Sequence, residues 1–223
     1  MTINIAFLKL VAYFAVLSNA ELDVIKQAFS EKTFQRGEVI LWEGEMSDVL
    51  FFVAVGAVKI FKTSSQGKEQ ILSIARPGDA LNDISIFDGK TNPVSAQALG
   101  PVTIYGIKRE RLQIVFQQNP ELTLNAIKVL AERTRHLFTL VEDLSFRHVL
   151  GRVVKILLTH AGDGGGPVQR LTQQEMAAMA GTAREVVARS LKALEEQGYI
   201  RLENHRIVIN DKESLQKILT DTI

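Results

Sequence analysis

The sequence predicts an α+β fold in three parts: an N-terminal antiparallel β jelly-roll barrel, a long helix and a C-terminal winged helix-turn-helix. Short β-branched and aromatic runs fill residues 35–115, and a heptad-spaced apolar seam follows Pro120. Two short helical patterns joined by "GT" then precede an alternating hairpin pattern. We expect a barrel domain with an N-terminal helix over 1–118, the long helix over 119–146 and the helix-turn-helix domain over 147–223.

The barrel is predicted from the runs "EVILWEGE", "VLFFVAVGAVKIFKT", "EQILSIARPGD", "PVSAQALG" and "VTIYGIKRE". Turn residues separate these runs, among them Gly44, Gly56 and the segments "SSQGK" and "DGKTNP". Short strands at regular spacing are typical of an antiparallel barrel or jelly roll. Before them, Ser18 and Glu21 form a capping box that opens the helix "AELDVIKQAF".

Composition excludes several classes of protein. The chain has 223 residues, of which 46% are hydrophobic and 23% charged, and its net charge of +1 carries no global signal for nucleic acid. Because it has no cysteine, disulfides, thiolate zinc sites and cysteine-held iron–sulfur clusters are excluded. No apolar stretch is long enough to span a membrane, and the capping box argues against a cleaved signal peptide at the N-terminus. We therefore expect a cytoplasmic protein.

The long helix carries apolar residues at alternating spacings of three and four, the repeat that defines a coiled coil. The seam favours a homodimer, and a helix packed on its own barrel is the alternative. The expected interface residues are Ile127, Leu130, Thr134, Leu137, Val141 and Leu144.

The C-terminal part has the helix-turn-helix pattern. Thr172 and Glu175 form a capping box for "QQEMAAMA", the dipeptide "GT" turns the chain, and "AREVVARSLKALEEQG" forms the second helix. Thr182 and Glu185 fit a second capping box at the start of that helix. The segment "YIRLE-NH-RIVIN" predicts a two-strand wing turning at residues 204–205.

One face of the second helix is predicted to be free. Val187, Leu191 and Leu194 recur at helical spacing and should face the core. The residues turned away are Arg184, Glu185, Ala188, Arg189 and Lys192. Arginine can pair with guanine, and glutamate can accept a hydrogen bond from cytosine. The alternative is a solvated charged face in which Glu185 and Arg189 form an i,i+4 pair.

The whole chain resembles the Crp/Fnr transcription regulators, most specifically in "LTQQEMAAMAGTAREVVARSLKALEEQGYI". The resemblance implies a cyclic-nucleotide-binding-type barrel, a dimerising helix and a winged helix that binds double-stranded DNA. The "RE…R" of Arg184, Glu185 and Arg189 is similar to the pattern of the catabolite activator proteins, which implies GTGA-type half-sites in an inverted repeat, an activator and RNA polymerase as a further partner. The expected DNA-contacting residues are Arg184, Glu185, Arg189, Thr182, Ala188, Thr172 and Gln173.

The expected effector pocket departs from the cyclic-AMP-binding members. Asn82 and Asp83 stand where the resemblance implies a Gly-Glu pair, and Pro93 or Val94 stands in place of an arginine. Lys90 is the only cation between residues 77 and 107, so an unpaired, buried Asp83 would oppose a bound phosphate. The sequence therefore argues against cyclic AMP and leaves the effector unknown. The expected pocket residues are Asp83, Ile84, Ser85, Val94, Ser95, Leu137 and Phe138.

Two alternatives stay open. A haem-based gas sensor of the same family would need a ligand such as His136, the one histidine on the long helix. A cupin-type barrel enzyme would need histidines in the barrel, yet all four histidines lie outside residues 35–115. We therefore expect neither catalysis nor a metal site.

Overall fold

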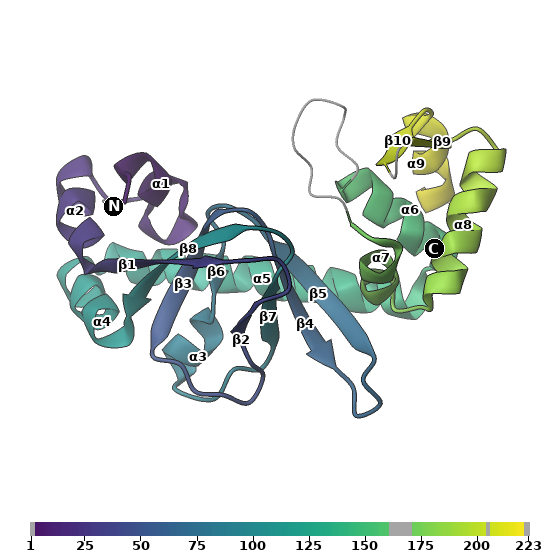
Figure 1. Cartoon of the computed structure of the whole chain (residues 1–223). Coiled ribbons are helices and arrows are strands. Elements are labelled where there is room, and N and C mark those ends of the chain that lie inside the picture. Colours follow the sequence, from purple (N-terminus) through teal and green to yellow (C-terminus); the bar gives the residue numbers. More distant parts are fainter. Residues whose placement is uncertain (1–2, 161–170, 204–205, 221–223) are drawn as a thin grey trace. The chain divides into compact units, whose positions relative to one another are not determined.

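A computed structural model describes residues 3–160, 171–203 and 206–220 of the chain. They divide into two compact units, one formed by residues 1–62 with 72–136 and the other by residues 63–71 with 137–223. The expected α+β class is confirmed: antiparallel sheets, one long helix and a C-terminal helix-turn-helix with a β-hairpin (Figure 1).

The barrel consists of two four-stranded antiparallel sheets in the orders β1-β8-β3-β6 and β2-β7-β4-β5. Their strands are β1 (Phe29–Phe34), β2 (Val39–Leu41), β3 (Val49–Val55), β4 (Val58–Thr63), β5 (Glu69–Ala75), β6 (Ala80–Leu81), β7 (Ser95–Ala98) and β8 (Val102–Lys108). Gly56 turns β3 into β4 at φ +88°, where a Cβ atom would lie 2.4 Å from the carbonyl oxygen of Pro101. This turn therefore requires glycine.

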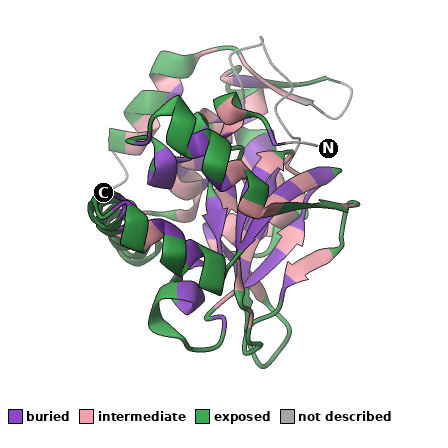
Figure 2. Cartoon of the chain, turned by 90° about the vertical axis from the view of Figure 1, so that its left-hand side faces the viewer, coloured by how far each residue is buried: buried purple, intermediate pink, exposed green. Residues whose placement is uncertain are grey.

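The first sheet is covered on both faces, which explains the continuous apolar run of β3. Phe51 and Val53 face the barrel interior, whereas Leu50 and Phe52 belong to a second core shared with Phe14 of the N-terminal helical segment. That segment consists of α1 (Ile5–Leu10), the 3₁₀ turn Ala12–Phe14, α2 (Asn19–Ile25) and the 3₁₀ turn Lys26–Ala28. Figure 2 shows buried residues concentrated on the strands and exposed residues on the outer sides of the helices.

Three elements differ from the prediction. The helix predicted over residues 20–29 ends as an α-helix at Ile25, and β1, which was not predicted, begins at Phe29 and pairs with β8 as an edge strand. Residues expected to be strand form the short helices α3 (Asp83–Asp88) and, from Arg109 onward, α4 (Arg109–Gln118). The capping box of Ser18 and Glu21 is confirmed.

The long helix α5 (Glu121–Phe146) begins against the N-terminal core, where Leu122 and Ala126 are buried. It ends just before His148, and α6 (Val149–His160) follows. Side chains on α6 fix this junction: the guanidinium of Arg152 donates to the carbonyl oxygens of Arg147, at 2.6 Å, and Ala180, at 2.7 Å. Asp143 accepts from Arg147 and Lys155.

The helix-turn-helix domain has its own apolar core, formed by α6, α7 (Gln173–Ala180), α8 (Arg184–Glu196) and α9 (Lys212–Thr220). The strands β9 (Ile200–Glu203) and β10 (Arg206–Ile209) pair antiparallel and form the expected wing. The predicted turn at residues 204–205 and the loop "DGGGP" lie outside the described residues.

Candidate nucleic-acid interface and effector site

The first helix of the helix-turn-helix begins as the sequence predicts. Thr172 is the N-cap of α7, its hydroxyl accepts a hydrogen bond from the backbone N–H of Glu175, and the Glu175 carboxylate accepts from the backbone of Thr172. Gly181 ends the helix in the left-handed conformation at φ 64°. Glycine adopts that conformation without strain, so the chain turns sharply into the second helix.

The expected capping box of Thr182 and Glu185 is wrong. The N-cap of α8 is Ala183, with no side-chain cap, and the helix begins at Arg184. The backbone N–H of Thr182 donates instead to the carbonyl oxygen of Ala177, so Thr182 belongs to the turn. Glu185 is consequently the second residue of the helix rather than the third, and a capping box needs the third.

The outward face of α8 is as expected. Val187, Leu191 and Leu194 are buried in the domain core, whereas Arg184 and Arg189 are exposed. Glu185 is also exposed, and within the described residues it forms no ion pair with Arg189. Two arginines and a glutamate therefore stand unconstrained on one face at the start of the second helix.

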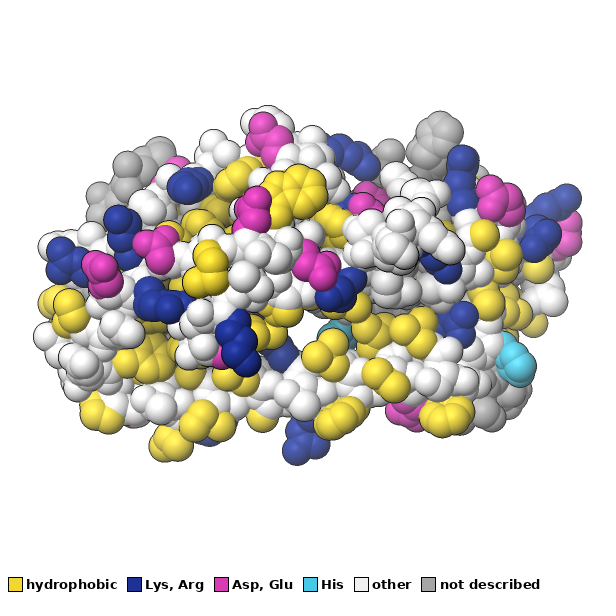
Figure 3. All heavy atoms as spheres, turned by 90° about the horizontal axis from the view of Figure 1, so that it is seen from below, with side chains coloured by type: hydrophobic (Ala, Val, Ile, Leu, Met, Phe, Trp, Pro, Cys, Tyr) yellow, Lys and Arg dark blue, Asp and Glu magenta, His cyan; other side chains and the backbone are white. Residues whose placement is uncertain are grey.

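The other predicted DNA-contacting residues, in α7, the turn and α8, differ in their exposure. Ala188 is half-buried on α8, and Thr182 is half-buried in the turn. Thr172 is exposed at the start of α7, and its neighbour Gln173 is half-buried. Basic and acidic side chains are interspersed on the face of the molecule in Figure 3, in agreement with the small net charge. The evidence for nucleic-acid binding therefore comes from the positions of exposed side chains on the helix-turn-helix, and not from an excess of positive charge.

In the barrel, Asp83 is buried but not unpaired, which overturns the premise used against a bound phosphate. Its Oδ2 accepts a 2.7 Å hydrogen bond from the hydroxyl of Tyr13, and its Oδ1 accepts a 2.5 Å bond from the guanidinium of Arg133. Arg133 also donates to the carbonyl oxygen of Ala80. The cation that pairs with Asp83 therefore comes from α5 and lies outside residues 77–107.

Burial and the charge of Asp83 raise the pKa of the Tyr13 hydroxyl above its ordinary value. Burial is the larger cause, because it disfavours the phenolate. Tyr13 is therefore a neutral donor at any physiological pH. Three segments of the chain meet at one carboxylate: the N-terminal helical segment, α3 and α5.

The residue before Asp83 explains one departure from the family pattern. Asn82 has φ 72° and is the only non-glycine residue with positive φ in the described part of the chain. Its side-chain amide donates to the carbonyl oxygen of Val49 at 2.9 Å. Asparagine tolerates the left-handed conformation better than most residues, so it can stand where the resemblance implies glycine.

Pro93 and Val94 stand where the resemblance implies an arginine. A lysine that lies outside residues 77–107 is beside them. Lys62 on β4 donates from Nζ to the carbonyl oxygen of Pro93 at 3.1 Å and forms a 2.7 Å ion pair with Glu43. The hydroxyl of Ser95 accepts a hydrogen bond from the backbone N–H of Glu43. Antiparallel pairing of β4 with β7 brings this lysine to the segment, a relationship that sequence spacing does not reveal.

The remaining predicted pocket residues are divided between the two compact units. Ser85 is buried beside Asp83 and donates to Asn92, whereas Ile84 is exposed. Val94 is half-buried next to Ser95. Leu137 and Phe138 belong to the other compact unit and are exposed, Phe138 to 70%.

The predicted dimer seam lies on an exposed apolar stripe of α5. Its centre is Ile127, Thr134 and Val141, all exposed. On one side Leu130, Leu137 and Leu144 are less exposed than the central apolar residues. On the other side lie three exposed residues that the seam omitted: Leu124, Ala131 and Phe138.

Neither a metal site nor a membrane helix is found in the described ranges. Histidine, aspartate and glutamate side chains nowhere gather there in threes that could hold a metal ion. Every described helix is too short or too polar to traverse a bilayer. His136, the residue considered for haem, has its Nε2 3.2 Å from the carbonyl oxygen of Leu72.

Two protein-family models match this chain. Residues 31–119 match the cyclic nucleotide-binding domain, and residues 151–218 match the Crp-like helix-turn-helix domain. The CRP-like cAMP-activated global transcriptional regulator of Mycobacterium tuberculosis is 34% identical over 191 residues, which cover 82% of this chain and 85% of that protein. The Cyclic AMP receptor protein of Thermus thermophilus is 30% identical over 202 residues, which cover 91% of this chain and 94% of that protein.

The structure of FixK2 from Bradyrhizobium japonicum shares the fold, with a TM-score of 0.77 at 23% identity over 85% of this chain and 96% of that one. A sensor-type barrel joined to a helix-turn-helix defines a DNA-binding transcription regulator and not an enzyme. The chain belongs to the Crp/Fnr family.

Proposed function

We propose that this regulator works as a homodimer that reads GTGA-type half-sites in an inverted repeat, controlled by a small molecule bound in the barrel. The single observation that carries the DNA-reading part is the exposed face of α8, where Arg184, Glu185 and Arg189 stand together. The N-terminal residues of the second helix of such a motif meet base edges in the major groove. Arginine pairs with guanine there, and glutamate accepts from cytosine.

The test compares two duplexes by fluorescence anisotropy, one with the inverted GTGA-type repeat and one with a scrambled sequence. Arg184→Ala should reduce the discrimination between them by about 1–3 kcal/mol, the value of one bidentate base contact. The control is Lys192→Ala, whose side chain is exposed on the same helix and paired with Glu196 at 3.7 Å. It should weaken binding to both duplexes alike, or not at all. Unchanged discrimination by Arg184→Ala contradicts the proposal.

The dimer is supported by the exposed stripe of α5. Apolar side chains at heptad spacing on a helix favour pairing with a second copy. We keep the division 1–118, 119–146 and 147–223 as the proposed functional parts, with the middle part joining two protomers. A cytoplasmic location follows from the DNA partner, and RNA polymerase is the proposed further partner of an activator.

For the effector, our proposal is a molecule other than cyclic AMP. It rests on Pro93 and Val94, which offer neither a cation nor, at Pro93, an N–H donor to a phosphate. The second candidate is cyclic AMP itself. The ion pair of Asp83 with Arg133 favours it, because a neutralised carboxylate no longer repels a phosphate. The two relatives named above, which carry cyclic AMP in their names, also favour it.

Calorimetric titration with cyclic AMP decides between these candidates. Binding that is lost in Lys62→Met and Arg133→Met, but kept in Lys90→Met, would establish the second candidate and contradict the first. Absence of heat, together with unchanged DNA affinity on addition of cyclic AMP, supports an effector of other chemistry. Haem would show itself separately as a Soret band in the purified protein.

A further inference from the structure

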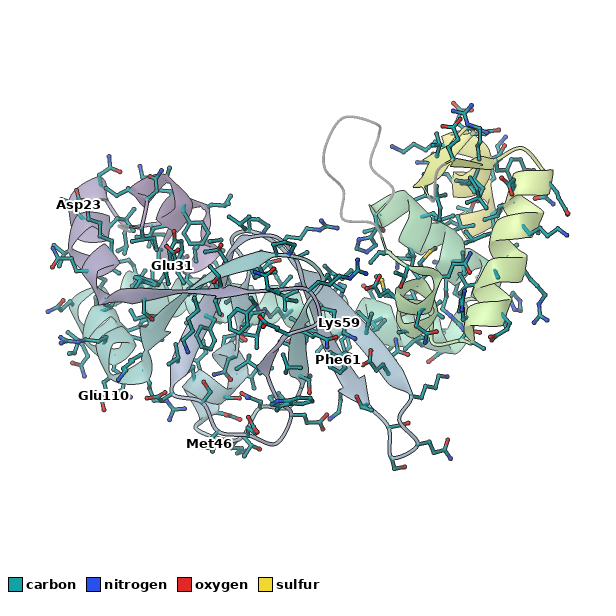
Figure 4. The ribbon with its side chains drawn as sticks, in the orientation of Figure 1. Asp23, Glu31, Met46, Lys59, Phe61 and Glu110 are labelled. Atoms are coloured by element: carbon teal, nitrogen blue, oxygen red, sulfur yellow. The ribbon has the colours of Figure 1, made fainter. Side chains whose placement is uncertain are left out.

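A cavity of about 540 Å³ opens beside the barrel interior, apart from the contacts of Asp83 with Tyr13 and Arg133. It lies between β1, the loop that joins β2 to β3, and the first residue of α4. Pockets of 300–1,000 Å³ hold small molecules in many proteins. Its apolar lining includes Leu41, Val49 and Phe51. Met46, labelled in Figure 4, stands on the loop at its rim.

Two cations line this cavity, Lys32 and Arg109. Lys32 pairs in register with Ile104, a fully buried residue of the barrel core, so its side chain points to the interior side of β1. Its Nζ lies 5.6 Å from the ring centre of Phe51. Within the described residues no carboxylate forms an ion pair with it. The second cation, Arg109, donates from its guanidinium to the carbonyl oxygen of Ser85, whereas its Nε is buried without a hydrogen-bond partner among the described residues.

Two carboxylates line the cavity from the β2–β3 loop, whose backbone is held in place. Asn92 exchanges backbone hydrogen bonds of 2.8 and 2.9 Å with Glu45 and Gly44, and the carbonyl oxygen of Asp48 accepts from the backbone of Arg109 at 2.7 Å. Glu45 and Asp48 are both among the residues that line the cavity. The lining thus combines an amine from β1, carboxylates from the β2–β3 loop and apolar side chains.

We propose that this cavity binds a zwitterionic α-amino acid with an apolar side chain. The carboxylate of the ligand pairs with Lys32, its ammonium pairs with Glu45 and Asp48, and its side chain covers Phe51, Leu41 and Val49. A monoanion would leave the two carboxylates facing a like charge, and an uncharged apolar molecule would desolvate Lys32 without a partner. Only the zwitterion offers a partner both to Lys32 and to the two carboxylates.

The site touches the segment that carries Asp83. Arg109 and Asn92, both at the cavity, hydrogen-bond Ser85, two residues after Asp83. An amino acid bound here therefore acts on α3, and it is a second ligand of the barrel whose existence does not depend on the identity of the first. DNA binding of the full chain is then expected to respond to it.

The test is calorimetry of the full chain with three matched probes: leucine, 4-methylpentanoate, which lacks the ammonium, and 3-methylbutylamine, which lacks the carboxylate. Leucine should bind. Each analogue should bind at least about tenfold more weakly, because it leaves either Lys32 or the two carboxylates without a partner. Lys32→Met and Glu45→Gln should each weaken leucine binding by about tenfold. Lys68→Met, at an exposed lysine of the β4–β5 turn, is the control and should leave it unchanged.

Circular dichroism and the melting temperature establish that both variants are folded. Two results would overturn the proposal: leucine that fails to bind the wild type at millimolar concentration, or leucine binding that survives both variants. Equal binding of 4-methylpentanoate and leucine would also overturn it, because the site would then recognise anions rather than zwitterions.

Discussion

The hydroxyl of Tyr13 donates a 2.7 Å hydrogen bond to Oδ2 of Asp83, and so joins two buried residues that lie 70 positions apart. The other oxygen of the carboxylate accepts from Arg133 and from the backbone of Ile84. A buried carboxylate is stable only when it is paired and hydrogen-bonded, and here each partner comes from a different segment. Removing any one partner is therefore expected to cost stability and to disturb the others.

Tyr13→Phe should lower the free energy of unfolding by about 2 kcal/mol at neutral pH, since it removes a hydrogen bond to a charged group. The variant keeps the ring and its edge-on contact with Phe52. Urea unfolding followed by circular dichroism measures the difference. Equal stability of variant and wild type would mean that the hydroxyl contributes nothing to folding.

The hydroxyl of Tyr13 is also expected to make the stability of the protein depend on pH in the alkaline range. Its pKa is raised in the folded state above the ordinary value of 10.0, so its contribution to stability is complete below pH 10 and is lost as the pH rises further. The wild type should lose up to about 1.4 kcal/mol per pH unit more than Tyr13→Phe in that range. Parallel stability curves for the two proteins between pH 9 and pH 11 would contradict this.

Arg133→Met should destabilise the chain by about 3 kcal/mol, because it leaves the 2%-exposed side chain of Asp83 without its cation. We expect the lower end of the usual range for a buried pair, since the guanidinium itself is 32% exposed. Adding Asp83→Asn should recover part of the loss, and Arg133→Lys should lose less than Arg133→Met. Additive effects of the two substitutions in a double-mutant cycle would show that the pair is not coupled.

Removing the N-cap of α7 and adding an N-cap to α8 are expected to change the stability of the DNA-binding domain in opposite directions. Thr172→Ala should cost about 1 kcal/mol, because it removes the N-cap of α7. Ala183→Ser should stabilise the domain by about 0.5–1 kcal/mol, because α8 has no side-chain cap. Differential scanning calorimetry measures both. Loss of stability in Ala183→Ser would argue that the turn before α8 does not accept a capping hydroxyl.

The dimer stripe predicts that Val141→Glu and Phe138→Glu convert the protein into monomers in sedimentation experiments. Both side chains are exposed apolar groups of α5, and each charge would lie unpaired in a coiled-coil seam. Lys128→Glu, next to the central Ile127 but off the stripe, is the control and should remain dimeric. A wild type that sediments as a monomer, or dimeric Val141→Glu, would reject this interface.

Features that depend on neighbouring residues could be predicted from the sequence. The capping boxes at Ser18 and Thr172, the buried face of α8 and most strands of the barrel follow from spacings of two to four residues, which local geometry determines. The first strand could not be found this way, because β1 is an edge strand whose four central residues are exposed and show no alternation. The start of α8 was misplaced by one residue, since the turn after Gly181 decides where that helix begins.

Features that depend on packing were decided only by the tertiary structure. Asp83 looked unpaired along the chain because its partners, Tyr13 and Arg133, lie 70 and 50 positions away. Lys62 reaches Pro93 only because β4 lies beside β7. The sequence by itself determined the class of protein and the free face of its recognition helix. The charges near Asp83 and Pro93 came from the fold, because sheet pairing and helix packing bring together side chains whose positions along the chain are unrelated.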